Sequence, residues 1–168
     1  DGRILTPLNE SGLRQLAAEL RRKKIESIAV SFLHSFVNPA NEERALAILQ
    51  EELPGVTLSV SHKVLPEIKE FERTATTAIN AYTQPLVARY LDRVGGRLEA
   101  AGCKGPLFLM HSGGGVVPSS VAAQFPVRMI ESGPVAGVLA AARVGHQGGH
   151  ASGLAYDMGG TTAKACLI

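Results

Sequence analysis

Apolar positions in the first third of the chain alternate between helical spacing and short continuous runs. The segment after Ser11 has helical spacing, and we expect Ser11 to cap a helix because its hydroxyl can accept a bond from a free backbone N–H. The apolar face of this helix would consist of Leu13, Leu16, Ala17 and Leu20. Residues 25–36 are rich in apolar and β-branched side chains, which predicts a buried strand.

A second helix and a second strand are predicted between residues 38 and 62. Asn38 as the cap and Pro39 at the first helical position favour a helix start, and the Pro-Gly pair at 54–55 ends the pattern. The residues expected to point inward are Ala45, Ile48, Leu49 and Leu53. Residues 56–62 alternate between apolar and polar, and the strand–helix–strand order favours parallel pairing.

A long helical pattern begins near Pro66 and runs to Gly102. Its apolar residues recur at spacings of three and four, and they are Ile68, Phe71, Ala75, Ala78, Ile79, Tyr82, Leu86, Tyr90, Val94 and Leu98. We expect Pro85 to kink or split this helix, because proline has no N–H donor and its ring crowds the preceding turn.

The last third of the chain combines short apolar runs with glycine-rich turns. We expect strands at 106–111, 127–130 and 153–156, a helix of small residues at 134–144, a flexible loop at 145–152 and a final strand from 163. The strands are expected to be mostly buried around Ile28, Leu58, Leu109, Met129 and Ala155. The alternation of strands and helices predicts an α/β fold, with a β-α-β-like region at 1–65 and a second region at 66–168.

Composition restricts the function classes. Hydrophobic residues make up 45% of the 168 residues, a globular balance, while a net charge of +2 and 5% aromatic residues argue against a nucleic-acid surface. The longest charge-free helical stretch, 135–142, is far too short to span a membrane. Cys103 and Cys166 form no metal-binding pattern and fit a reducing cytoplasm. Because the chain starts without Met and stops inside a strand-like run, we expect an internal fragment.

The segment 156–164, Tyr-Asp-Met-Gly-Gly-Thr-Thr-Ala-Lys, carries the strongest chemical signal. A strand would deliver Asp157 to a Gly-Gly turn, where glycines permit a positive φ and let backbone N–H groups approach an anion. The expected phosphate donors of the turn are Gly159, Gly160, Thr161 and Thr162. The alternative is a plain β-hairpin that binds nothing.

Two side chains of this segment would add charge to the site. Asp157 is the expected catalytic residue and would hold Mg²⁺ through water, since hard cations prefer oxygen ligands. Lys164 would place a positive charge near phosphate. The segment is not a Walker loop, because GxxxxGK[ST] does not occur and a strand is expected to follow.

A turn and a helix of small residues precede this loop at 131–142. Small residues, including Gly133 and Gly137, allow close backbone packing beside a nucleotide cleft. A turn, such a helix, a loop and a strand that ends in Asp-x-Gly-Gly-Thr resemble the actin-like ATPase superfamily, with its ribonuclease H-like core. In that superfamily the helix connects two lobes, and the hairpin opens the second lobe.

Several segments in one order, over nearly the whole chain, resemble the hydantoinase/oxoprolinase family more specifically. They are SIAVSFLHSFVNP at 27–39, VLPEIKEFERT at 64–74, TTAINAY at 76–82, MHSGGG at 110–115, SGPVAG at 132–137 and YDMGGT at 156–161. Within the family the chain looks like the A subunit of N-methylhydantoinase, with relatives in 5-oxoprolinase and the acetone and acetophenone carboxylases. Many relatives carry Asp shortly after the Thr pair, where this chain has Ala163 and Lys164, so the role of Lys164 stays open.

The resemblance implies an enzyme that uses ATP and Mg²⁺ to phosphorylate the carbonyl of a cyclic amide, such as a hydantoin or 5-oxoproline, before hydrolysis. It also implies a B-type partner subunit, a second phosphate loop upstream and an adenine site downstream, so the fragment alone should be inactive. An ATP-dependent ketone carboxylase is the first alternative. A nucleotide switch or interaction module that shares only the superfamily fold is the second.

Other residues have weaker functional signals. The Ser-Gly-Gly-Gly run at 112–115 would either approach a ligand or form a tight turn. Glu72 or Arg73 would face a cleft or form a surface ion pair, with the ion pair favoured, and Asn80 would be buried and hydrogen-bonded or exposed. The histidines fit structural roles: His34, His62 and His111 lie at strand ends, and His146 and His150 would bind metal only with further ligands.

Overall fold

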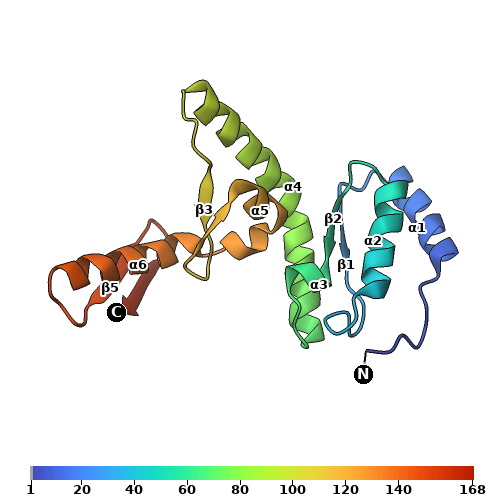
Figure 1. Cartoon of the computed structure of the whole chain (residues 1–168), viewed down its shortest axis with the longest axis horizontal. Coiled ribbons are helices and arrows are strands. Elements are labelled where there is room, and N and C mark those ends of the chain that lie inside the picture. Colours follow the sequence, from blue (N-terminus) through green and yellow to red (C-terminus); the bar gives the residue numbers. More distant parts are fainter. Residues whose placement is uncertain (1) are drawn as a thin grey trace. The chain divides into compact units, whose positions relative to one another are not determined.

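The computed structural model describes residues 2–168, and the chain divides into two compact units, up to Tyr90 and from Leu91 onward. The helices are α1 (Glu10–Arg22), α2 (Ala40–Glu52), α3 (Ser61–Val64), α4 (Glu70–Ala100), α5 (Ser119–Gln124), the 3₁₀-helix η1 (Pro126–Met129) and α6 (Ser132–Gln147) (Figure 1). The strands are β1 (Ser27–Val30), β2 (Thr57–Val60), β3 (Phe108–Met110), β4 (Val116–Pro118), β5 (Leu154–Met158) and β6 (Ala163–Leu167). The helices and strands confirm the α/β class.

The first unit is built on the parallel pair β1–β2, which confirms the predicted pairing. Ser27 is in register with Thr57, and Val30 with Val60. Figure 1 shows α1 and α2 together on one side of the strands and α4 on the other. The core between the strands and the two helices contains Ala17, Val30, Ala45, Leu49, Leu53 and Val60. The inward positions predicted for α2 are therefore confirmed.

The expected boundaries of the first unit need two corrections. Asn9, not Ser11, caps α1, because its side-chain oxygen accepts from the N–H of Gly12 at 3.0 Å. Strand β1 covers only four residues of the predicted run at 25–36. The rest is a loop, and one buried serine in it, Ser35, bonds to a side chain outside the strands.

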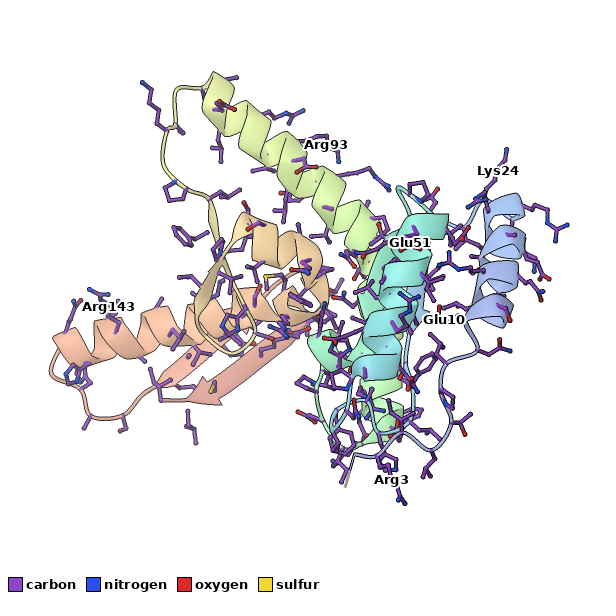
Figure 2. All side chains as sticks on the ribbon, turned by 45° about the vertical axis from the view of Figure 1, so that its right-hand side comes forward. Arg3, Glu10, Lys24, Glu51, Arg93 and Arg143 are labelled. Atoms are coloured by element: carbon purple, nitrogen blue, oxygen red, sulfur yellow. The ribbon has the colours of Figure 1, made fainter. Side chains whose placement is uncertain are left out.

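Ion pairs connect the two helices on their outer surface. Arg44 bonds both carboxylate oxygens of Glu10 at 2.7 Å, and Arg14 bonds Glu52 at 2.6 Å and Glu51 at 3.0 Å. Figure 2 labels Glu10 and Glu51 on these two helices. Their arginine partners lower the pKa of Glu10 and of Glu52.

Helix α4 continues through Pro85 as one element, so of the two expected outcomes, a kink or a split, the split is wrong. Proline leaves the carbonyl of Ala81, four residues earlier, without its helical N–H partner. The hydroxyl of Ser27 on β1 donates to this carbonyl at 2.6 Å. A side chain from the neighbouring strand therefore replaces the hydrogen bond that the proline removes.

The apolar stripe of α4 faces outward, whereas the apolar face of a conventional amphipathic helix is buried. Phe71 is 81% exposed and Tyr82 is 85% exposed, although the 3–4 spacing suggested an inward face. The fully buried residues in this part of α4 are instead polar: Arg73, Thr77 and Asn80. Arg73 and Asn80 bond Ser61 and Ser59 of the first unit, whereas Thr77 bonds the carbonyl of Arg73 in its own helix, so polar contacts help to fix this face of the helix.

The second unit contains two antiparallel strand pairs and three short-to-medium helices. β3 pairs with β4, and β5 pairs with β6. The predicted strand at 127–130 is wrong, because residues 127–129 belong to η1 and Ile130 is the residue that follows it. Pro126 at its start favours a helical turn over a strand, and a short apolar run cannot distinguish the two.

Other expectations for the second unit are confirmed in outline. The small-residue helix is longer than predicted and forms α6, and the last two predicted strands form β5 and β6. Of the five positions expected to be buried, only Ala155 is fully so, at 7% exposure; Ile28, Leu58, Leu109 and Met129 are partly exposed. Within residues 2–168, no helix is long and apolar enough to cross a membrane.

Candidate phosphate-binding site

The hairpin β5–β6 holds the segment with the strongest chemical signal. Asp157 on β5 is in register with Lys164 on β6, so the two residues are direct cross-strand neighbours. The turn between them is closed by the N–H of Gly159, which donates to the carbonyl of Thr162 at 2.9 Å. Asp157 and all residues of the turn are exposed, as a site for an external anion requires.

Helix α6 packs beside β5, and an open groove of about 500 Å³ runs between the helix and the hairpin. Gly133 and Gly137 line it from the helix, and Asp157 and Lys164 line it from the hairpin. The structure thus brings four of the predicted site residues into one groove, next to the turn that carries the other four. Their binding role remains a prediction.

The glycines of the loop and the helix are not required by the fold of the described residues. Neither Gly159 nor Gly160 adopts a left-handed φ, which corrects the expectation that the turn needs one. A Cβ added to Gly133, Gly137 or Gly160 would meet no atom within 4 Å. These positions leave room beside the backbone, as Gly95, Gly96 and Gly145 do elsewhere in the described residues.

An ion pair links the groove to the residue before α6. The Lys164 ammonium group donates to the Glu131 carboxylate. From the sequence, Glu131 was expected only to begin the turn before the helix, and its contact with Lys164 was not predicted. The sequence signal for this contact is the charge of Glu131, which stands directly before α6. The first turn of that helix contains no acidic residue.

The other glycine-rich turn, at 112–115, has a different explanation. A Cβ on Gly113 or on Gly115 would lie 2.7 Å from the ring of His111. The His111 ring also accepts from the N–H of Gly113 at 2.9 Å. These contacts favour the tight-turn alternative for this segment, because the histidine ring fills the space that side chains would need.

A buried polar cluster lies at the carboxyl ends of β1 and β2. Glu42 and Arg73 are both 0% exposed, and the Ser61 hydroxyl connects them: it donates to Glu42 at 2.6 Å and accepts from Arg73 at 3.1 Å. Ser35 contacts the same hydroxyl at 3.0 Å. The favoured reading of Arg73 as a surface residue is therefore wrong, and its burial is the reason that it bonds only to groups of the protein.

Hydrogen bonds hold Glu42 in its charged form. Burial alone would raise the pKa of Glu42, but the Ser61 hydroxyl, the N–H groups of His62 and Phe32 and the His62 ring donate to it, and together they lower its pKa. Arg73 is satisfied by the carbonyls of Glu67 and Phe32 and by the Glu70 carboxylate. Glu42 and Arg73 are thus paired with groups of the protein, while the buried Nε2 of His62 has no hydrogen-bond partner among the described residues, and we assign the cluster a structural role.

Family comparison agrees with the sequence motifs. The family model described as hydantoinase/oxoprolinase matches residues 73–168, and the model of the hydantoinase/oxoprolinase N-terminal region matches residues 1–53. The chain belongs to the hydantoinase/oxoprolinase family. The first match contains the whole groove and hairpin.

Two relatives of this family member align along its full length. An uncharacterised protein of Methanocaldococcus jannaschii is 41% identical over 100% of the chain and 25% of its own length. The caprolactamase subunit alpha of Pseudomonas jessenii is 35% identical over 99% of the chain and 24% of its own length. The chain therefore spans about a quarter of the length of these relatives.

Solved structures show the same fold. The crystal structure of ATP-dependent caprolactamase from Pseudomonas jessenii matches with a TM-score of 0.91 and 34% identity, over 99% of this chain and 24% of that one. The nucleotide-free structure of acetone carboxylase, from a study of ATP-dependent acetone carboxylation, matches with a TM-score of 0.83 and 31% identity, over 98% and 23%.

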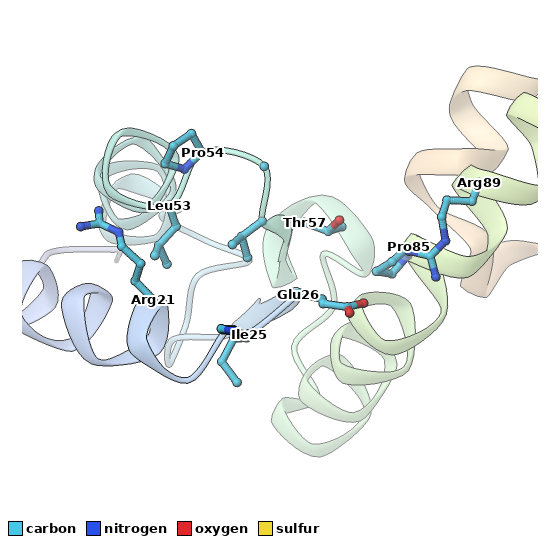
Figure 3. Close-up of a pocket in the computed structure, with 11 residues that line it drawn as sticks. Arg21, Ile25, Glu26, Leu53, Pro54, Thr57, Pro85 and Arg89 are labelled. Carbon is cyan, nitrogen blue, oxygen red and sulfur yellow. The ribbon is translucent and has the colours of Figure 1, made fainter.

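Another hollow in this family member lies in the first unit, at the amino ends of the parallel strands β1 and β2. It measures about 530 Å³ and is lined by Glu26 and Thr57 at the strand starts, by Arg21, and by Pro85 and Arg89 of α4 (Figure 3). Open α/β sheets bind ligands at the carboxyl ends of their strands. Its position at the amino ends therefore makes this hollow a weaker candidate than the groove beside α6.

Metal-ligand geometry is not present in the described part of the chain. Residues 2–168 contain no group of three or more His, Cys, Asp or Glu side chains arranged to hold a metal ion. His146 and His150 therefore lack the converging ligands that a metal site would need. The Asp157 carboxylate would instead meet a cation that arrives with phosphate, since Mg²⁺ binds few protein groups and keeps several waters.

Proposed function

We propose that the protein containing this chain is an ATP-dependent enzyme that activates the carbonyl of a cyclic amide and hydrolyses the ring. The observation that carries the proposal is the groove lined by Gly133, Gly137, Asp157 and Lys164, beside the exposed turn of the hairpin. Family membership supports it, because a relative is named caprolactamase and its structure is described as ATP-dependent. The proposed frame is part of an actin-like core, with a region boundary near residue 65.

The residues of the loop fit the phosphates of a nucleotide. The turn glycines leave room for backbone N–H groups to approach phosphate oxygens, and the two threonine hydroxyls add donors. Asp157 would bind Mg²⁺ through water, because a carboxylate beside phosphates is repelled unless a cation lies between them. Lys164 would offset part of the phosphate charge. Parts of the protein outside this chain would supply the second phosphate loop and the adenine site.

Bound ATP would supply a phosphoryl group to the carbonyl oxygen of the substrate, which makes the carbonyl carbon a better target for water. The C–N bond of the ring then breaks, and ADP and phosphate are the other products. The contribution of this chain is electrostatic: it places fixed donors and a held cation where charge develops on the transferring group.

The test is ATP turnover and ring opening by the full-length protein with an Asp157→Asn substitution. This change keeps the shape and removes the charge, and we expect turnover to fall by about a hundredfold or more, since single preorganised groups are often worth about 3 kcal/mol. Thr57→Ala, on β2, is the matched control and should turn over like the unchanged protein. Equal turnover by Asp157→Asn would mean that the loop is only a structural hairpin.

A ketone carboxylase is the second candidate, favoured by the likeness to the acetone carboxylase structure. Bicarbonate-dependent consumption of ATP and ketone would support it, whereas a ring-opened product without bicarbonate supports the hydrolase. Relatives named as subunits support a partner of the B type, which should co-purify with the full-length protein from cytoplasm. ATP turnover that responds to peptides alone would favour a nucleotide switch.

A further inference from the structure

Lys164 has a partner in this structure that would compete with phosphate. Its ammonium group is bonded to the Glu131 carboxylate, while Asp157 faces it across the hairpin. Glu131 lies at the junction between η1 and α6, so the ion pair connects two separate elements of the second unit. The ammonium group that we expect to contact phosphate is thus already paired with a carboxylate.

The backbone of Glu131 indicates that this contact is not incidental. The residue has φ 65° and ψ 12°, a left-handed conformation that is strained for a residue with a Cβ. Observed strain of this kind is common at binding and switching sites. Its side chain also makes no capping bond to α6, although a carboxylate at that position normally bonds the free N–H groups of the first turn.

The ion pair is placed where exchange is easy. The Lys164 side chain is 38% exposed and the Glu131 side chain is 61% exposed. Exposed ion pairs add little to the free energy of unfolding. The contact with Lys164 therefore does not offset the backbone strain at Glu131. Phosphate carries more charge than a carboxylate and accepts stronger hydrogen bonds, so a phosphate in the loop attracts Lys164 more strongly than Glu131 does.

We propose that Glu131 is the resting partner of Lys164, and that nucleotide phosphate displaces its carboxylate on binding and yields to it again on product release. This inference rests on the proposed function, because it assumes that phosphate binds in the loop at 157–164. Glu131 is then a positioning residue that acts through Lys164, with no direct contact to the nucleotide.

Removing the competing charge has a specific consequence. Glu131→Gln should tighten binding of ATP by about two- to fivefold, the factor that corresponds to an exposed ion pair of up to about 1 kcal/mol. It should also lower kcat, because no carboxylate recaptures Lys164 when the products leave. KM and kcat therefore fall together, a pattern that mere loss of a structural contact does not produce.

The experiment is calorimetric titration of the full-length protein with ATP and Mg²⁺, together with steady-state kinetics, for five variants, one of which is the Asp157→Asn variant described above. Lys164→Met should weaken ATP binding by about tenfold or more, since a hydrogen bond to a charged group is lost. The double variant Glu131→Gln/Lys164→Met should bind ATP like Lys164→Met alone, because Glu131 acts only through the lysine. Glu10→Gln removes an equally charged surface partner, that of Arg44, and should change neither constant.

Each outcome separates this inference from the proposed function. If Lys164→Met and Asp157→Asn both bind ATP like the unchanged protein, phosphate does not bind this loop and both ideas fail. If these two variants lose affinity but Glu131→Gln binds ATP equally or more weakly, only the exchange between Glu131 and phosphate is wrong. It is also wrong if Glu131→Gln tightens binding equally well in the Lys164→Met background.

Discussion

Two pairs of charged residues, one in each unit, differ in their burial. In the first unit Glu42 and Arg73 are completely buried, and every bond that they make goes to another group of the protein. In the second unit Asp157 is exposed and Lys164 is partly exposed, beside glycines that face open space. A closed polar cluster holds structure through its internal bonds, although the buried Nε2 of His62 in this one has no hydrogen-bond partner among the described residues, whereas an open cluster can accept a ligand. Glu42 and Arg73 lie on helices α2 and α4, whereas Asp157 and Lys164 lie on paired strands, so the two sets also differ in their place in the fold.

The largest stability effect should come from opening the closed cluster. Arg73→Met leaves the buried Glu42–Ser61 pair without its cation and should lower the free energy of unfolding by about 3–5 kcal/mol. Arg14→Met removes an exposed arginine from two ion pairs and should lower the free energy of unfolding far less, because water screens exposed pairs. Urea denaturation of both variants makes the comparison. Similar losses would show that Arg73 is not held as described.

A smaller loss is expected at the hydrogen bond between Ser27 and α4. Ser27→Ala leaves the buried carbonyl of Ala81 without a donor and should cost about 1–3 kcal/mol. Pro85→Ala restores the helical N–H, so the double variant should lose less than Ser27→Ala alone, as a double-mutant cycle of unfolding free energies would show. Additive losses would mean that the serine does not compensate for the proline.

The pH dependence should be the smallest and most local effect. The folded pKa of Glu42 lies below its ordinary value of 4.5. Its charged form therefore adds stability above pH 4.5, and this contribution disappears as the pH falls through the lower, folded pKa. Glu42→Gln removes the group that titrates, so stability should fall less steeply with acid below pH 4.5. An unchanged slope of urea midpoints against pH would contradict this assignment.

Sequence reasoning succeeded where local signals were strong. The end of α2, its inward side chains and the hairpin around the Gly-Gly turn all follow from local chemistry. The start of α2 lies one residue later than predicted, with Pro39 and not Asn38 as the cap residue, although the Asn38 side chain accepts from the N–H of Ala40 at 3.1 Å. The site residues could be predicted as a group for the same reason, since a strand, a glycine turn and a second strand bring them together. β4 and α5 were missed, because three- and six-residue elements leave little periodic signal.

The errors arise where distant residues decide the structure. The spacing of apolar residues on α4 indicated an inward stripe, but Arg73 and Asn80 face inward because Ser61 and Ser59 accept or share their hydrogen bonds. Pro85 is accommodated because Ser27, on strand β1, donates to the carbonyl that the proline leaves without a helical partner. The Glu131–Lys164 pair joins residues 33 positions apart in the sequence. Such contacts depend on tertiary packing, which a single sequence does not reveal.

The most direct test of the phosphate assignment is a matched pair of glycine substitutions within the second unit. Gly160→Val places a side chain in open space at the proposed phosphate loop, while Gly115→Ala places a methyl group 2.7 Å from the His111 ring. Thermal unfolding and calorimetric ATP titration of the full-length protein are measured for both. We predict that Gly160→Val keeps the unfolding temperature and loses ATP affinity, and that Gly115→Ala lowers the unfolding temperature. A Gly160→Val variant that binds ATP like the unchanged protein would contradict the assignment of this loop to phosphate.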